Sequence, residues 1–329
     1  MKRWLKITLG AAALLMVGAC AYTAYVYHSV QTAANAMYHP RSIVQPAAIS
    51  TLATGGAGRP AVTSNGSGTP NPAAISQFKP FTVLVLGVDQ RPHDRGRSDT
   101  MIVLSVNPAE GTVLMFNIPR DTRTELIGRG REDKINHAFA FGGVDMSIRT
   151  VEHFLNHPMD YYVQMNMEGF AKMVDLLGGV AVNNPLDFQY EGHHFTQGSL
   201  KLNGTEALAY ARMRFDDPRG DLGRNARQRE LLKQMLKQIV AQAISKEGLL
   251  RVKSILQAAG EQIRTDMTFD DMTTFLTRIG PSLRQTDMIE LKGHGTKING
   301  VYYYIVDDQE RQRIRGLMEK HLLTTAISP

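Results

Sequence analysis

Thr82-Val83-Leu84-Val85-Leu86-Gly87-Val88-Asp89 is a continuous run of β-branched and large apolar residues that ends in a carboxylate. Such a run predicts a strand that is buried on both faces, in a sheet covered by helices on either side. Thr100 to Val106 and Thr112 to Ile118 predict two further strands, joined by a loop of hairpin length. Because open α/β sheets bind ligands beyond the ends of their strands, Asp89 also marks a place to look for a functional site.

Helical spacing of apolar residues follows these strands and alternates with shorter strands. One segment stops at Gly178-Gly179, a common signal for the C-terminus of a helix, and Thr268 with Asp271 resembles a capping arrangement. The pattern predicts helices over 145–156, 170–177, 206–212, 225–245, 272–279 and 308–322, and strands over 180–182, 288–292 and 301–305. This mixture predicts an α/β domain over residues 80–329, a three-layer α/β/α sandwich with a central mixed sheet.

Charge is distributed unevenly along the chain. Residues 1–80 contain six Lys and Arg residues but no Asp or Glu, whereas the whole chain holds 37 Lys+Arg and 31 Asp+Glu. The formal net charge of +6 therefore belongs to this N-terminal segment, and residues 81–329 are neutral overall. A nucleic-acid-binding domain needs a concentrated basic surface, so we expect no nucleic-acid partner.

The segment Ile7–Tyr27 has no charged residue over 21 positions, and three positive charges precede it. About 20 such residues span a bilayer, and a positive flank stays on the cytoplasmic side. We therefore expect residues 1–28 to form a cytoplasmic N-terminus and a transmembrane signal anchor. The protein would be a single-pass type II protein of the cell membrane with an extracytoplasmic domain. A cleaved signal peptide is the main alternative, and a lipoprotein processing site at Cys20 is a weaker one.

Beyond this segment, residues 29–79 are rich in Ala, Ser, Thr, Gly, Pro and Asn, which predicts a flexible extracytoplasmic linker. Cys20, the only cysteine, precedes this linker. The domain can therefore contain no intrachain disulfide, and no thiol can act there as a nucleophile or a metal ligand.

Two carboxylates are candidates for a metal site. Asp89 ends the buried strand and Asp99 opens the next one, so both can lie at one end of the sheet. They suit a hard cation such as Mg²⁺, or Mn²⁺ in its place, which takes one or two carboxylates together with phosphate oxygens of a substrate. The alternative is that both residues only cap strands and solvate a loop.

Basic residues occur where they can converge on an anion. Arg212 and Arg214 are two positions apart on an extended segment and therefore point to one side of it. Their planar guanidinium groups match phosphate oxygens two at a time. The further candidates are Arg120 and Asp121 after the third strand, Lys134, and the set Arg224, Arg227 and Gln228 on one face of the next helix.

The alternative for these arginines is a set of ion pairs with the neighbouring acidic residues Asp216, Asp217, Asp221 and Glu230. Two carboxylates beside many arginines nevertheless describe a diphosphate site. Phosphoryl transfer asks a protein mainly for positioning and neutralisation of charge, which such a site supplies.

Seven motifs in order make the chain from Phe81 to about Ile244 resemble the LytR-CpsA-Psr family of Gram-positive wall proteins, especially its LytR/TagU branch. Leu222 departs from the pattern, because many relatives carry Phe there, and Lys246–Pro329 contributes little to the resemblance. The motifs are Leu86-Gly87-Val88-Asp89-Gln90-Arg91, Arg97-Ser98-Asp99-Thr100-Met101, Ile118-Pro119-Arg120-Asp121-Thr122, Lys134-Ile135-Asn136-His137-Ala138, Val174-Asp175-Leu176-Leu177-Gly178-Gly179-Val180, Arg212-Met213-Arg214 and Asp221-Leu222-Gly223-Arg224-Asn225-Ala226-Arg227-Gln228.

The resemblance implies an α/β/α fold with an apolar pocket for a polyprenyl chain and a pyrophosphate at its mouth. It implies Asp89 and Asp99 as ligands of Mg²⁺, and a catalytic set of Asp89, Arg120 and Asp121. The pyrophosphate contacts that it implies are Arg97, Arg120, Arg212, Arg214, Arg227 and Gln228, supported by Lys134 and Arg224.

The activity that the resemblance implies is transfer of teichoic acid or another anionic glycopolymer from undecaprenyl pyrophosphate to the muramic acid 6-hydroxyl of peptidoglycan. The partners would be the lipid-linked glycopolymer, peptidoglycan and the cell membrane. The other functions considered are hydrolysis of the lipid pyrophosphate and binding of polyprenyl phosphate without turnover.

Overall fold

The computed structural model describes residues 2–42, 78–89, 96–243, 260 and 262–323. Its centre is a six-stranded sheet in the order β11-β6-β1-β2-β3-β12. The strands are β1 (Phe81–Asp89), β2 (Arg97–Asn107), β3 (Thr112–Asn117), β6 (Tyr161–Asn166), β11 (Ile263–Thr265) and β12 (Gln285–Met288). Because β1 pairs antiparallel with β2 and parallel with β6, the sheet is mixed, as the sequence predicts.

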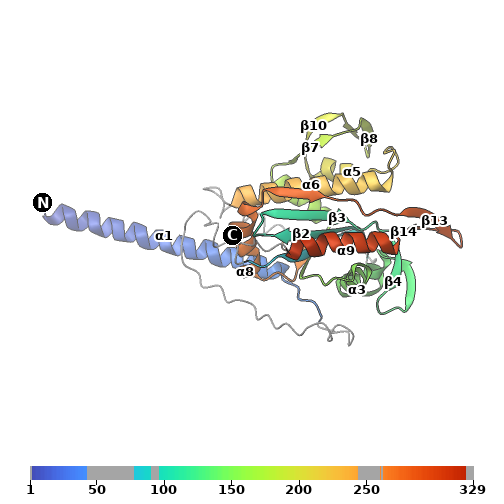
Figure 1. Cartoon of the computed structure of the whole chain (residues 1–329). Helices are drawn as coiled ribbons and strands as arrows, with labels where there is room; N and C mark the ends of the chain where they lie inside the picture. Colours follow the sequence, from blue (N-terminus) through green and yellow to red (C-terminus); the bar gives the residue numbers. More distant parts are fainter. Residues whose placement is uncertain (1, 43–77, 90–95, 244–259, 261, 324–329) are drawn as a thin grey trace.

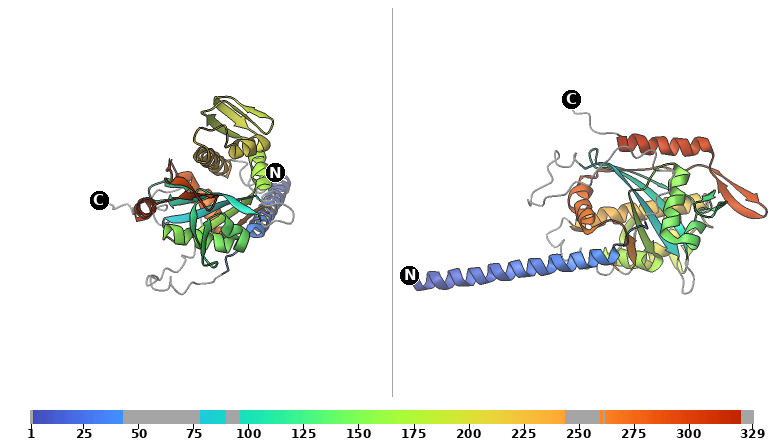
Figure 2. Two further views of the ribbon diagram at one scale, coloured as in Figure 1. Left: turned by 90° about the vertical axis from the view of Figure 1, so that its right-hand side faces the viewer. Right: turned by 90° about the horizontal axis from the view of Figure 1, so that it is seen from below.

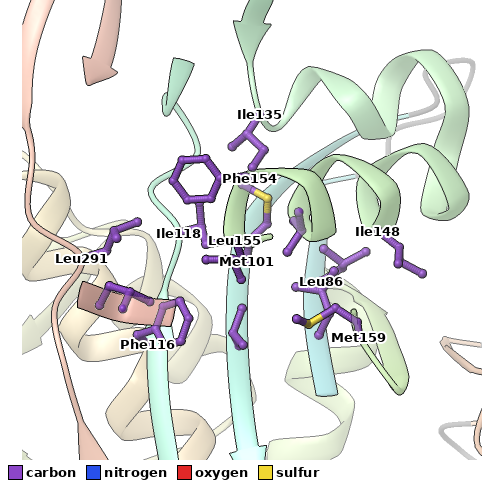
Figure 3. Packing of buried hydrophobic residues seen from close by; sticks show 14 of the residues in the cluster. Leu86, Met101, Phe116, Ile118, Ile135, Ile148, Phe154, Leu155, Met159 and Leu291 are labelled. Atoms are coloured by element: carbon purple, nitrogen blue, oxygen red, sulfur yellow. The ribbon is translucent and has the colours of Figure 1, made fainter. Parts of the chain in front are cut away.

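Helices cover both faces of this sheet (Figure 1). Successive residues of β1 point to opposite faces, and they therefore pack in two different hydrophobic clusters. Leu84 and Leu86 pack with α3 (His137–Leu155) and α9 (Asp308–Leu323), and Figure 3 shows the centre of this cluster. Val83 and Val85 face the other side, towards α6 (Asp221–Ala243) and the short π-helical turn η1 (Phe275–Ile279). The three-layer arrangement places the ends of β1 and β2 between the helical layers.

A second, smaller layer lies over α6 and encloses its own core, in which Tyr210 is buried (Figure 1). Helices α4 (Met167–Leu176) and α5 (Gly204–Arg212) form its base. Two short sheets complete it: β7 (Val180–Asn184) with β10 (Gly198–Leu202), and β8 (Phe188–Tyr190) with β9 (His193–Phe195).

The C-terminal segment, which contributes little to the sequence resemblance, is part of the domain. It supplies both edge strands of the central sheet, the covering helix α9, and α8 (Phe269–Thr274) with the 3-10 turn η2 (Gly280–Ser282). The hairpin of β13 (His294–Ile298) and β14 (Val301–Ile305) hydrogen-bonds through Tyr304 N to Asp121 O at 2.9 Å. A second hairpin, β4 (Arg123–Leu126) with β5 (Arg131–Lys134), lies beside it.

Most element predictions are confirmed within a few residues, and the differences have local causes. The strand expected at 288–292 lies at β12 instead, and Leu291 turns into the core with 1% of its surface exposed. The predicted capping arrangement at Thr268 is confirmed as a capping box with Asp271. Helix α3 starts earlier than expected and is kinked at Gly142-Gly143, where the backbone leaves helical geometry.

The N-terminal helix α1 (Lys2–Met37) continues past the expected start of the linker at residue 29. Val30, Ala34 and Met37 are buried in the same cluster as α4 and α5, so this part of the segment packs against the domain. The rest of the predicted linker, residues 43–77, lies outside the described residues. Figure 2 shows α1 extending from one end of the domain and the β13–β14 hairpin from the other.

Among the helices of the described residues, none is both long enough and apolar enough to cross a membrane. In α1 the side chains are described from Leu15 onward, with the exception of Ala19 and Val26.

Candidate functional site

A polar pocket lies at the end of β1 and β2, where the two candidate metal carboxylates meet. Asp89 and Asp99 both line it, together with Arg120. The register of β1 against β2 shifts between Gly87 and Val88, a bulge of the kind that re-aims side chains next to sites. Thr100 of β2 also lines it, and the remaining lining residues come from four other segments: Met167, Tyr190, Glu191, Ala211, Arg212, Arg214, Phe215, Arg224 and Gln228.

Arg120 is held in the pocket by carboxylates on two sides. Its Nη1 lies 3.2 Å from Asp99 Oδ1, and its Nε lies 3.9 Å from Asp121 Oδ2. Burial disfavours the guanidinium charge, but Asp99 and Asp121 outweigh this effect and raise the pKa of Arg120 above its ordinary value. Its buried Nε has no hydrogen-bond partner among the described residues, so a donor remains for an anion in the pocket.

Arg224 adds a second buried cation at the first turn of α6. Its Nη2 lies 2.5 Å from Asp221 Oδ1, and only 6% of the residue is exposed. Burial lowers the pKa of Arg224 although Asp221 opposes this, and the nearby Arg120 lowers it further. Two guanidinium groups and the N-terminus of a helix together favour an anion at this position.

Arg212 and Arg214 lie at the other wall, in more exposed positions. Arg212 Nη1 is 3.6 Å from Glu191 Oε2, and Arg214 Nε is 3.7 Å from Asp221 Oδ1. Both ion pairs are longer than a hydrogen bond and partly open to solvent, so they constrain the side chains weakly. These arginines therefore remain able to turn towards a ligand.

An apolar cavity adjoins the polar pocket. It runs between the sheet and α6, where Ile102, Leu232 and Met235 line it. The two spaces are adjacent, because five residues line both of them: Thr100, Met167, Ala211, Arg212 and Gln228. The arrangement fits a molecule with an apolar chain and an anionic head.

Four of the predicted site residues do not line the polar pocket. Arg97 is exposed beside Asp89 on the neighbouring strand. Lys134 Nζ lies 2.7 Å from Asp121 Oδ1, and Asp121 in turn lies beside Arg120. The fourth, Arg227, is buried elsewhere.

Arg227 is a structural residue in the described conformation and does not line the polar pocket, unlike the other predicted residues of its helix. Its Nε donates to Tyr210 O at 3.1 Å, its Nη1 to Asp217 Oδ2 at 2.5 Å, and its Nη2 to Met213 O. The residue is 4% exposed, and Asp217 is 5% exposed. Because its donors are used inside the protein, Arg227 fixes the loop between α5 and α6 that carries Arg214.

Sequence reasoning did not assign Asn136 and Glu191, which the structure places at the site. Asn136 Nδ2 donates to Asp99 Oδ1 at 3.2 Å and orients that carboxylate. Glu191 sits in the β8–β9 turn at a φ of 47° and pairs with Arg212. The position of Asn136 in the Lys134-Ile135-Asn136-His137 motif could have predicted that it lies at the site. Glu191 lies in a turn outside the motifs, and no sequence feature predicts its place at the site.

The described residues contain no group of three or more His, Cys, Asp or Glu side chains that could hold a metal ion. Asp89 and Asp99 are two carboxylates that line the polar pocket. A two-carboxylate site fits Mg²⁺, because this ion commonly takes one or two protein carboxylates and completes its shell with water and substrate phosphate. The donor set is therefore compatible with the predicted ion.

The chain matches the model of the LytR_cpsA_psr family over residues 43–320. A relative from Halalkalibacterium halodurans, named polyisoprenyl-teichoic acid–peptidoglycan teichoic acid transferase TagU, is 48% identical over 251 residues, covering 75% of this chain and 81% of that protein. A protein of the same name from Bacillus mycoides is 39% identical over 318 residues, covering 96% of this chain and 97% of its own.

Solved structures agree with the fold. The crystal structure of B. subtilis TagU is 40% identical with a TM-score of 0.62, and the match covers 77% of this chain and 100% of that one. A structure described as TagT bound to LIIa-WTA is 29% identical with a TM-score of 0.62, covering 77% of this chain and 92% of that chain. The match to the family model ends at residue 320, well beyond residue 244, where the resemblance carried by the sequence motifs ends.

Proposed function

Because the chain belongs to the LytR_cpsA_psr family, we propose that it is a transferase that moves an anionic glycopolymer from a polyprenyl pyrophosphate carrier to peptidoglycan. The carrier would be undecaprenyl pyrophosphate, the polymer a teichoic acid or a similar chain, and the acceptor the muramic acid 6-hydroxyl. The name of the relatives, teichoic acid transferase, supports the reaction class, and the arginines of the polar pocket support binding of a diphosphate.

One observation carries this proposal: the apolar cavity and the polar pocket share five lining residues. A polyprenyl chain would lie in the cavity beside α6, and its diphosphate would reach Arg120, Arg224, Arg212 and Arg214. The buried Nε atoms of Arg120 and Arg224 have no hydrogen-bond partner among the described residues. A buried donor without a partner costs free energy, so a bound anion that accepts from these groups would stabilise the site.

Asp89 and Asp99 would hold Mg²⁺ next to the diphosphate, where the ion supplies neutralisation of phosphate charge. Asn136 and Arg120 keep Asp99 oriented through its Oδ1.

The acceptor hydroxyl would attack the phosphorus that carries the polymer. A new phosphodiester bond forms to the acceptor oxygen, the bond from this phosphorus to the bridging oxygen breaks, and polyprenyl phosphate leaves. Arg120 and Arg224 stabilise the charge that develops on the leaving phosphate. The hydroxyl proton would pass to Asp89, because Asp89 lines the pocket and Asp121 does not.

The same proposal places the domain outside the cytoplasm, held by the apolar segment Ile7–Tyr27. The positive flank at Lys2, Arg3 and Lys6 supports this orientation. Protease added to intact cells would digest the domain if the orientation is correct, and protection of the domain would contradict it.

The test uses the full chain in detergent with lipid-linked polymer, peptidoglycan and Mg²⁺, and measures wall-attached and free polymer separately. Asp99→Ala and Arg120→Ala are each expected to lower transfer by about 10²–10³-fold, the range for a lost charge-stabilising group. Arg123→Ala is the matched control, because Arg123 pairs with Glu132 on the β4–β5 hairpin and does not line the pocket. Transfer that survives both site substitutions would overturn the assignment.

The same measurement separates the competing functions. Free polymer without attachment would identify a lipid pyrophosphate hydrolase, since water would then have replaced the acceptor. Tight binding of the lipid without any product would identify a module that only holds the carrier.

A further inference from the structure

Gln228 lines both the apolar cavity and the polar pocket. Its side-chain amide can present either its oxygen or its nitrogen to a ligand there. An anion in the pocket is stabilised only by the nitrogen end. The orientation of this amide therefore decides whether Gln228 helps or opposes anion binding.

The neighbours of Gln228 fix that orientation through Asn117, the last residue of β3. Arg229 Nη1 donates to Asn117 Oδ1 at 2.9 Å, and arginine can only donate. Asn117 must therefore present its oxygen to Arg229 and its nitrogen to the other side. That nitrogen lies 3.4 Å from Gln228 Oε1, which turns the oxygen of Gln228 towards Asn117.

The Nε2 group of Gln228 is then left for the remaining neighbours. It donates to Ala211 O at 3.3 Å, and Ala211 itself lines both spaces. An amide nitrogen carries two hydrogens, so one remains for a ligand at the junction of the cavity and the pocket.

We propose that Arg229 and Asn117 are positioning residues that hold the amide of Gln228 with its nitrogen towards the diphosphate. Both are buried, at 6% and 2% exposure, so water cannot reverse this chain of hydrogen bonds. Burial also lowers the pKa of Arg229, with Glu290 opposing the shift, yet a guanidinium group keeps its charge and its donors at neutral pH. This proposal rests on the proposed function, because it deepens the recognition of the same diphosphate.

The test replaces Asn117 by Asp, which keeps the shape and can still accept from Arg229 but cannot donate to Gln228. Pyrophosphate binding to the full chain in detergent with Mg²⁺ is measured by titration calorimetry. Asn117→Asp should weaken binding by about tenfold, the effect of losing one hydrogen bond to a charged group. Its thermal stability should be kept, because the new carboxylate pairs with Arg229. Unchanged affinity would overturn the proposal.

A double-mutant cycle separates positioning from a general structural effect. In a Gln228→Ala background, Asn117→Asp should weaken binding clearly less than in the unmodified protein, because only the added charge still acts and the amide that Asn117 orients is gone. An equal loss in both backgrounds would show that Asn117 acts by another route and would overturn the proposal.

Asn107→Asp is the control. Asn107 is also buried at the end of a central strand, but its Nδ2 donates to His321 O on α9, far from the pocket in the fold. The variant Asn107→Asp should leave the affinity for pyrophosphate unchanged in the folded protein. A tenfold loss of affinity in this variant would overturn the proposal. Absence of binding by the unmodified chain would instead refute the site and, with it, this relay.

Discussion

At the scale of single residues, arginines that look equivalent in the sequence have different roles: some stabilise the fold, and others line the polar pocket. Arg227 and Arg212 lie in adjacent motifs, but Arg227 is buried with Asp217 whereas Arg212 lines the polar pocket and is partly exposed. Removing one member of a buried ion pair leaves the other charge without compensation, which is much costlier than losing a partly exposed pair.

Arg227→Met is therefore expected to lower the free energy of unfolding by about 3–5 kcal/mol, because Asp217 would lose its buried partner. Arg212→Ala should change it by less than about 0.5 kcal/mol while weakening pyrophosphate binding. Denaturant unfolding and calorimetry on the two variants check this contrast. Equal stability of both variants would contradict the structural role of Arg227.

Gly223 shows why the motif around Arg224 requires a residue without a side chain. A Cβ at this position would lie 1.8 Å from Asp217 Oδ2. Gly223→Ala should destabilise the protein by about 1–3 kcal/mol, since Asp217 must move away from Arg227 to admit the methyl group. Gly316→Ala on the exposed face of α9, where nothing lies within 4 Å, should stabilise it by about 0.5–1 kcal/mol. Thermal unfolding of both variants would test the pair.

Residue chemistry and spacing predicted which side chains gather, but not which of them face the ligand. Asp89, Asp99, Arg120, Arg212, Arg214, Arg224 and Gln228 all line the pocket as expected. Arg227 and Gln228 are neighbours on one helix, and only packing against Tyr210 and Met213 decides that the first points inward. A local pattern carries no information on such contacts between distant segments.

At the scale of elements, helix α9 packs on the central sheet through Ile314 and Met318 and is also hydrogen-bonded to it through His321. His321 Nδ1 lies 2.8 Å from Ser105 Oγ on β2, and its Nε2 lies 2.9 Å from Thr112 Oγ1 on β3. Burial lowers the pKa of His321 below its ordinary value, although Glu110 and Asp287 oppose this shift. The helix is thus attached through an imidazole that folding keeps neutral.

Stability should consequently fall in mild acid. Below about pH 6.5 the unfolded chain binds a proton at His321 that the folded chain does not, so the free energy of unfolding rises with pH in this range. The contribution is complete above pH 6.5 and is lost as the pH falls towards the lowered pKa. His321→Gln should flatten this part of the stability profile, measured by urea unfolding between pH 5 and 8. An unchanged slope in the variant would contradict the assignment to His321.

The periodicity of apolar residues predicted the central strands and the long helices well, because each buries a regular face. It was weakest for β12, whose Gln285–Met288 segment is polar and partly exposed. An edge strand of this kind is defined by backbone pairing with β3, from Gln285 opposite Thr112 to Met288 opposite Met115, and not by its own side chains. The apolar segment that follows it was therefore the more attractive but wrong choice.

At the scale of the whole molecule, the end of α1 is built into the domain. Tyr38 bridges to Thr265 on β11, and His39 N donates to Thr265 O at 2.7 Å. Arg41 Nε lies 2.7 Å from Asp266 Oδ2, and its two terminal nitrogens donate to Met159 O and Asp160 O. These contacts connect the end of α1 to the domain through residues 38–41.

This docking should contribute measurably to the stability of the domain. Met37 is 6% exposed within the cluster that includes Met173 and Tyr210, so Met37→Ala removes buried apolar contacts and leaves a cavity. A loss of about 2–5 kcal/mol in the free energy of unfolding is expected, the range for such truncations. Asn35→Ala, on the exposed face of the same turn, should cost less than about 0.5 kcal/mol. If Met37→Ala unfolds at the same temperature as Asn35→Ala in detergent, the end of α1 does not contribute to the stability of the domain, and this prediction is wrong.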